Sequence, residues 1–123
     1  MTAVPVAADG VTRFVTDLEE EGHRPAVHGD VVRYHVVPVA GAQAGQEVIT
    51  GVGTSELQAW PMAPPHWIHL GEGVALSSST NTDTQLCPPG WRRHSFDTGA
   101  WVLNRKPIHL WVAHVRGVLS LAI

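Results

Sequence analysis

The segment that most constrains the fold begins at Trp60 and ends at Leu70. Its first part holds three closely spaced prolines, Pro61, Pro64 and Pro65. Proline fixes φ and has no backbone donor, so residues 59–65 form neither a helix nor a central strand. Residues that precede a proline are also extended. The apolar run 67–70 that follows is typical of a strand. The sequence therefore predicts a rigid extended corner that leads directly into a strand.

The composition fits a single folded domain over residues 1–123. Hydrophobic residues make up 44% of the chain and charged residues 15%, so one core is easily filled. We expect residues 1–8, which are small and mostly apolar, to be frayed. The net charge is -3 and the basic residues are scattered, which argues against nucleic acid as a partner.

The sequence also bears on the compartment. It has no apolar run of about 18 residues and no signal-peptide pattern, so we expect no membrane association. The single cysteine, Cys87, excludes an internal disulfide and fits a reducing environment. The expected location is therefore the cytoplasm.

Helical periodicity is clear near both ends of the chain. An apolar stripe at helical spacing follows Asp9, a suitable N-cap, and ends before Gly22, a suitable stop. Its members are Val11, Phe14, Val15 and Leu18. A second helix is predicted to begin at Pro107, since proline suits the first turn. Its expected apolar face consists of Leu110, Trp111, His114, Val115, Val118 and Leu121 or Ala122.

Between the helices the pattern shortens to that of strands. Val27 and residues 31–37 flank a turn at Gly29-Asp30, and residues 47–52 and 67–70 supply two more strands. Short connections favour antiparallel neighbours, so we expect a four-stranded meander. A long irregular loop follows and carries Cys87. The predicted fold class is α+β: an N-terminal helix, a four-stranded antiparallel meander, an irregular active-site loop and a C-terminal helix.

This order resembles the ubiquitin-conjugating (UBC) fold. The corner Trp60-Pro61-Met62-Ala63-Pro64-Pro65 matches the family pattern aromatic-Pro-x-x-Pro-Pro, and Cys87 lies 22 residues beyond Pro65. The segment Trp91-Arg92-Arg93-His94-Ser95, followed by Trp101, is similar to the compact bacterial relatives of ubiquitin-conjugating enzymes. The resemblance implies that Cys87 accepts a ubiquitin-like modifier from an activating enzyme and transfers it to an amine. The implied partners are the activating enzyme and the ubiquitin-like protein, and no cofactor is implied on this chain.

The resemblance and the local chemistry together select three candidate catalytic residues. Cys87 is the nucleophile, because a thiolate attacks and leaves readily near neutral pH. Asn81 is a candidate oxyanion donor, since it is the nearest asparagine and the window that holds His-Pro-Asn in the family reads Ser77-Ser78-Ser79. His94 is a candidate base or orienting group for the thiol.

Other roles for these residues stay open. Cys87 can be an inert residue under the loop, as free cysteines often are. In that case a loop hydroxyl among Ser77 to Thr80, or Thr82, can form an oxyester after stronger activation. The histidine pairs His66/His69 and His109/His114 have spacings unsuited to joint metal binding, so no metal site is expected.

Two further functions compete with the transferase. The first is a catalytically inactive UBC-like binding module or scaffold for a ubiquitin-like protein, and the second is a small zinc or Cys-His hydrolase. The tryptophans bear on binding: Trp67 and Trp111 fit core positions, whereas Trp60, Trp91 and Trp101 flank loops, where they can shape a groove for a bound tail.

Overall fold

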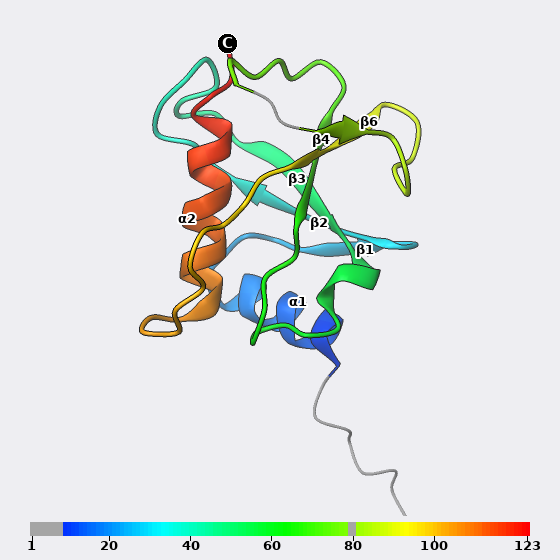
Figure 1. Cartoon of the computed structure of the whole chain (residues 1–123), viewed down its shortest axis with the longest axis vertical. Coiled ribbons are helices and arrows are strands. Elements are labelled where there is room, and N and C mark those ends of the chain that lie inside the picture. The colour runs from blue at the N-terminus through cyan, green and yellow to red at the C-terminus, as the bar shows by residue number, and fades with distance from the viewer. Residues whose placement is uncertain (1–8, 79–80) are drawn as a thin grey trace, which may run out of the picture.

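The computed structural model describes residues 9–78 and 81–123, in which two α-helices pack on a six-stranded antiparallel sheet (Figure 1). The predicted frayed start, residues 1–8, lies outside the described residues, as do Ser79 and Thr80. The strand order across the sheet is β1-β2-β3-β4-β6-β5. The predicted α+β class is therefore confirmed. No helix in the described ranges is long and apolar enough to cross a membrane.

The first helix, α1, spans Gly10–Glu20 and confirms the predicted helix and both of its end signals. The Asp9 carboxylate accepts a hydrogen bond of 2.8 Å from the backbone N–H of Thr12, which caps the helix. After the helix, Gly22 takes a φ of +79°, which glycine adopts without a steric penalty. Phe14 and Leu18 of the apolar stripe are fully buried.

The first four strands form the predicted meander. They are β1 (Ala26–His28), β2 (Val31–Val36), β3 (Val48–Gly53) and β4 (Trp67–Gly71), and each pairs antiparallel with the next. A short 3₁₀ helix, η1 (Thr54–Leu57), separates β3 from the proline corner. The corner was predicted to be extended, but residues 58–62 form turns, in which the Met62 N–H donates to the Ala59 carbonyl at 2.8 Å. The Trp60–Pro61 peptide bond is cis.

The segment predicted as an irregular loop contains two more strands. These are β5 (Thr82–Asp83) and β6 (Trp91–Ser95), and β6 pairs with β4 along its whole length. The prediction missed β6 because Arg92, Arg93 and His94 are not typical strand formers. In β6 the side chain of Arg93 lies on the outward face and contacts the Trp67 ring of β4. Its guanidinium carbon lies 4.0 Å from the centroid of that ring.

The second helix, α2, spans Pro107–Leu119 and begins at the predicted proline. Its apolar face differs from the prediction, because Ile108, Val112 and Leu119 are buried, whereas Leu110 is only half-buried. The helix also ends before Leu121 and Ala122, and Ala122 instead forms an isolated bridge with Leu76. The centre of the face is Trp111, as predicted; its indole N–H donates to the Tyr34 hydroxyl at 2.8 Å in the core.

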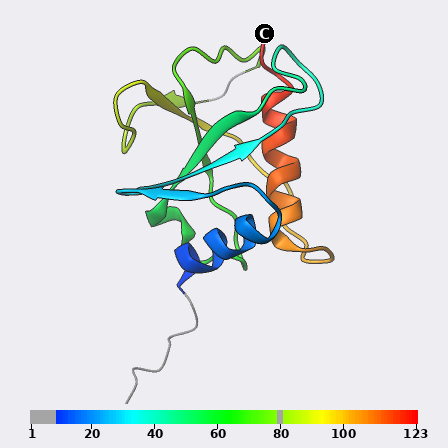
Figure 2. The ribbon, with the colours of Figure 1, turned by 180° about the vertical axis from the view of Figure 1, so that it is seen from behind.

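Both helices pack on the same face of the sheet. In the views of Figure 1 and Figure 2, α2 stands beside the strands and α1 lies at their lower end. Tyr34 marks this core face, since both Phe14 of α1 and Trp111 of α2 contact it. The predicted places of two tryptophans were wrong. Trp60 is 5% exposed in the core, beside Phe14, whereas Trp67 is partly exposed on the opposite face.

Candidate active site

The outer face of the sheet is the face opposite the helices. It carries a row of polar and charged side chains that come from directly paired residues in neighbouring strands. Strand pairing places Arg33 on β2 opposite Gly51 on β3, Gly51 opposite His69 on β4, and His69 opposite Arg93 on β6. Arg93 in turn pairs with Asp83 on β5. Because side chains directly opposite each other in neighbouring strands share a face, His69 lies between the two arginines.

Cys87 lies over this row, in the loop between β5 and β6. Its backbone N–H donates to the Thr84 carbonyl at 3.1 Å, and after it the Trp91 N–H donates to the Pro88 carbonyl at 3.2 Å. The second turn has Gly90 at φ +88°, a conformation that favours glycine at this position. The loop places the partly exposed Cys87 sulfur 3.7 Å from Nδ1 of His69.

His69 is held firmly in the middle of the site. Its side chain is 1% exposed, and its backbone carbonyl accepts a hydrogen bond of 3.0 Å from the Thr50 hydroxyl. Burial, together with the charges of Arg93 and Arg33, lowers the pKa of His69 from 6.5 to about 4. At neutral pH this imidazole is therefore uncharged, and one of its ring nitrogens carries no hydrogen, although the lowered pKa makes it a weaker base than an ordinary imidazole.

Cys87 is also uncharged at rest. Burial raises the pKa of its thiol, and the nearby positive charge of Arg93 offsets only part of that effect. The resting site is thus a neutral thiol beside a neutral imidazole, not a thiolate–imidazolium ion pair. In this state the thiol reacts only if a proton acceptor removes its hydrogen during the attack, and the ring nitrogen in contact with the sulfur is Nδ1 of His69.

Arg93 is fixed beside His69 and Cys87 by three hydrogen bonds. Its Nε donates to one Asp83 oxygen at 2.6 Å, and one terminal nitrogen donates to the other Asp83 oxygen at 3.3 Å and to the Gln85 side chain at 2.9 Å. The ion pair lowers the pKa of Asp83 and raises that of Arg93. Asp83 also accepts the Gln85 N–H at 2.9 Å, so one carboxylate orders both the arginine and the start of the Cys87 loop.

The structure places the predicted residue His94 on the core face of the sheet. It is 5% exposed and lies opposite Ile68, next to Arg93 but on the other side of β6. Within the described part of the chain, the histidine in contact with the Cys87 sulfur is His69 and not His94. Burial lowers the pKa of His94, and both of its ring nitrogens lack a partner among the described residues.

Asn81 lies directly before β5 and is exposed. Its backbone carbonyl accepts a hydrogen bond of 2.9 Å from Ser95, whereas none of the hydrogen bonds between described residues joins its side chain to Cys87. Of the alternative hydroxyls, Ser77 is tied through its N–H to the Leu121 carbonyl at 2.7 Å, and Ser79 and Thr80 lie outside the described residues.

Sequence reasoning missed His69 and Arg93, although a signal for both was present. In the strand 67–70 alternate residues point to opposite faces, so His69 must face away from the core that buries Ile68 and Leu70. The same alternation in β6 separates Arg93 from His94. What the sequence does not carry is the pairing of β4 with β6, which brings the two outward residues together. No group of three or more metal-binding side chains occurs in the ranges described.

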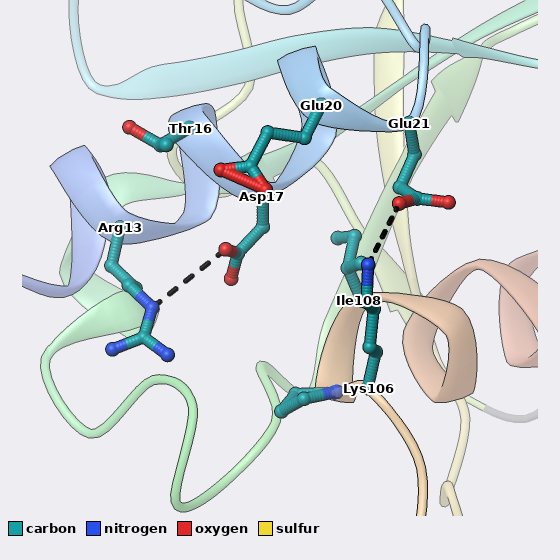
Figure 3. Close-up of a pocket in the computed structure, with 8 residues that line it drawn as sticks. Arg13, Thr16, Asp17, Glu20, Glu21, Lys106 and Ile108 are labelled. Carbon is teal, nitrogen blue, oxygen red and sulfur yellow. Dashed lines mark ion pairs between the residues drawn. The ribbon is translucent and has the colours of Figure 1, made fainter.

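A cavity of about 310 Å³ lies elsewhere, where α1 meets the start of α2 (Figure 3). It is lined by Arg13, Thr16, Asp17, Glu20, Glu21, Lys106, Pro107 and Ile108. Ion pairs cross or border it, with Arg13 3.7 Å from Asp17 and Lys106 3.6 Å from Glu21. Among the described residues, these pairs leave Glu20 as the one lining carboxylate outside them, and none of the lining residues belongs to the Cys87 loop.

Comparison with known proteins adds no family to this geometry: no protein-family model, no curated protein and no solved structure matches the chain.

Proposed function

We propose that the protein is a UBC-like acyl carrier, which accepts a ubiquitin-like modifier from an activating enzyme as a thioester on Cys87 and transfers it to an amine. The observation that carries this proposal is the 3.7 Å contact between the Cys87 sulfur and Nδ1 of a buried, neutral His69. It supplies a nucleophile and a proton acceptor in one partly exposed site, as acyl transfer through a thiol requires.

The chain order supports the UBC part of the proposal. An N-terminal helix, a four-stranded meander and a proline corner precede the cysteine in the sequence, as the resemblance implies. Strands β5 and β6, which flank Cys87, are an addition to that expectation. In the proposed enzyme they hold the cysteine loop against β4, where His69 lies.

The proposed reaction has two steps. In the first, the Cys87 sulfur attacks the thioester carbonyl of the charged activating enzyme while His69 takes the thiol proton; the activating enzyme's sulfur leaves and is protonated. In the second, a substrate amine attacks the Cys87 thioester, the C–S bond breaks, and the amine proton passes to the departing sulfur. The raised pKa of Cys87 makes proton removal by His69 part of the first attack. Asn81 remains the predicted oxyanion donor.

The alternative function is a catalytically inactive UBC-like module that binds or scaffolds a ubiquitin-like protein. Two observations favour it: burial keeps the thiol protonated at neutral pH, and Ser77-Ser78-Ser79 stands where the family has His-Pro-Asn. Such a module needs no reactive sulfur, so substitution of Cys87 separates the two functions.

The test is a charging assay with an activating enzyme and ubiquitin-like protein from the same genome, ATP and a non-reducing gel. A carrier gives a band shifted by one modifier, which disappears with reductant and is absent in Cys87→Ala. Cys87→Ser then gives a shifted band that survives reductant and is cleaved by hydroxide. If the activating enzyme charges itself and the wild-type protein gives no shifted band, the binding module is the better account.

Two histidine variants assign the proton acceptor. We expect His69→Gln to slow charging on the order of 100-fold, the usual contribution of a positioned general base. His94→Gln is the matched control, because it removes a buried histidine from the next strand but from the opposite face. If His94→Gln slows charging as much as His69→Gln does, and both remain folded, the role assigned to His69 is wrong.

A further inference from the structure

Arg33 extends across the outer face toward the cysteine site. It starts on β2, yet its guanidinium carbon lies 4.5 Å from the centroid of the Trp91 ring on β6. Strands β3 and β4 lie between these two strands, so the side chain spans them. This cation–π contact holds the guanidinium over the Trp91 ring without using its hydrogen-bond donors.

The two arginines of the site differ in how their charge is satisfied. Arg93 is bound by Asp83 and Gln85. Arg33 has neither an ion pair nor a hydrogen bond to another described residue, and its Nε is buried without a partner. A buried donor on a charged group costs free energy unless an acceptor reaches it. Arg33 therefore still has a donor to offer to an acceptor on a ligand.

Besides Nε of Arg33, His69 presents a second unsatisfied donor, in the same row of paired residues. Its Nε2 is also buried without a described partner, while Nδ1 faces the Cys87 sulfur. When the thiol donates to Nδ1, the neutral ring carries its hydrogen on Nε2, which then needs an acceptor. The charge of Arg33 is close enough to help lower the pKa of His69.

We infer that Arg33 and His69 form an anion subsite beside Cys87, which takes a carboxylate carried by the acyl substrate near its reacting carbon. The planar guanidinium matches the two oxygens of a carboxylate, and Trp91 holds it ready for that contact. The inference rests on the proposed role of Cys87 as the reacting thiol. It adds the class of substrate, an acyl group with an acidic substituent.

The test compares two alkylating reagents that differ in charge. Iodoacetate transfers a carboxymethyl group to the sulfur and iodoacetamide a carbamoylmethyl group: an S–C bond forms at the CH₂ carbon, the C–I bond breaks, iodide leaves and the thiol proton passes to solvent. Cys87 is the only cysteine, so mass spectrometry gives its rate with each reagent directly. No activating enzyme or modifier is needed, so this result is independent of the charging assay.

We expect Arg33→Gln to lower the iodoacetate rate on the order of fivefold and to leave the iodoacetamide rate unchanged, since only the anionic reagent gains from the positive charge. Arg92→Gln is the matched control, because Arg92 is an exposed arginine on β6, on the face opposite Arg93. It should change neither rate. Equal ratios of the two rates in wild type and Arg33→Gln would overturn the inference, and so would an equal loss with both reagents, which indicates a structural role.

A competition experiment identifies the anion. At constant ionic strength, sodium acetate should slow the reaction of wild-type Cys87 with iodoacetamide relative to sodium chloride, and Arg33→Gln should abolish that protection. Protection by inorganic phosphate but not by acetate would overturn the assignment of a carboxylate. Arg33→Lys keeps the charge but loses the planar fork, so it should retain only part of the protection.

Discussion

Protonation of His69 should make the protein measurably less stable in mild acid. In the folded state the pKa of this imidazole is about 4, against an ordinary value of 6.5. The unfolded chain therefore binds a proton at pH values where the folded chain does not, and protons favour unfolding in that window. The contribution of His69 to stability is complete above the ordinary value and is lost as the pH falls toward about 4.

The size of the effect follows from these two pKa values. Between pH 7 and pH 5 the linkage relation gives a loss of about 2 kcal/mol in the free energy of unfolding from His69 alone. Solvent screening removes little of this, because the side chain is only 1% exposed. His94 and His114, whose pKa values are also lowered by burial, add to the same trend.

Urea unfolding followed by tryptophan fluorescence at the two pH values measures this loss. His69→Gln has no imidazole to titrate, so its stability should fall by about 2 kcal/mol less than that of the wild type between the same pH values. His28→Gln is the control, since it removes an exposed histidine from the edge strand β1 and should keep the wild-type difference. If wild type and His69→Gln lose the same free energy, the pKa of His69 is not lowered in the folded protein, and His69 is not buried as the structure has it.

Two further substitutions test the core. Tyr34→Phe removes the acceptor of the Trp111 indole N–H, and leaving that donor buried should cost about 1–3 kcal/mol in urea unfolding; an unchanged midpoint would contradict this hydrogen bond. Gly10→Ala should destabilise the packing of α1 on η1, because the added Cβ would lie 1.4 Å from the Leu57 carbonyl oxygen. Gly73→Ala, where nothing lies within 4 Å, is its control, and equal melting temperatures for the two variants would refute the close approach.

The sequence predicts the parts of the fold that local rules determine. Helix α1 has an N-cap at Asp9, an apolar stripe and a stop at Gly22, and these signals act within a few residues of each other. At the corner after Trp60 the three prolines correctly exclude a helix and a central strand, but residues 58–62 form turns and not the extended run that was predicted. Pro107 also correctly marks the start of α2.

The candidate site depends on contacts that local rules do not describe. Cys87 was recognisable as the single thiol in a turn-rich segment. The histidine that contacts its sulfur was not, because His94 is nearer to Cys87 in the sequence, whereas His69 is nearer in space. The pairing of β4 with β6 decides between them, and it is stabilised by stacking of Arg93 on Trp67. A strand that depends on such side-chain pairs has little period-two hydrophobic signal of its own.

The lengths of the strands affect how the protein behaves at high concentration. The two outermost strands are the shortest, three residues in β1 and two in β5. An exposed strand edge offers unpaired N–H and C=O groups to another chain, and short edges are one way in which proteins limit such contacts. The sheet therefore offers other molecules little backbone on which to grow a fibre.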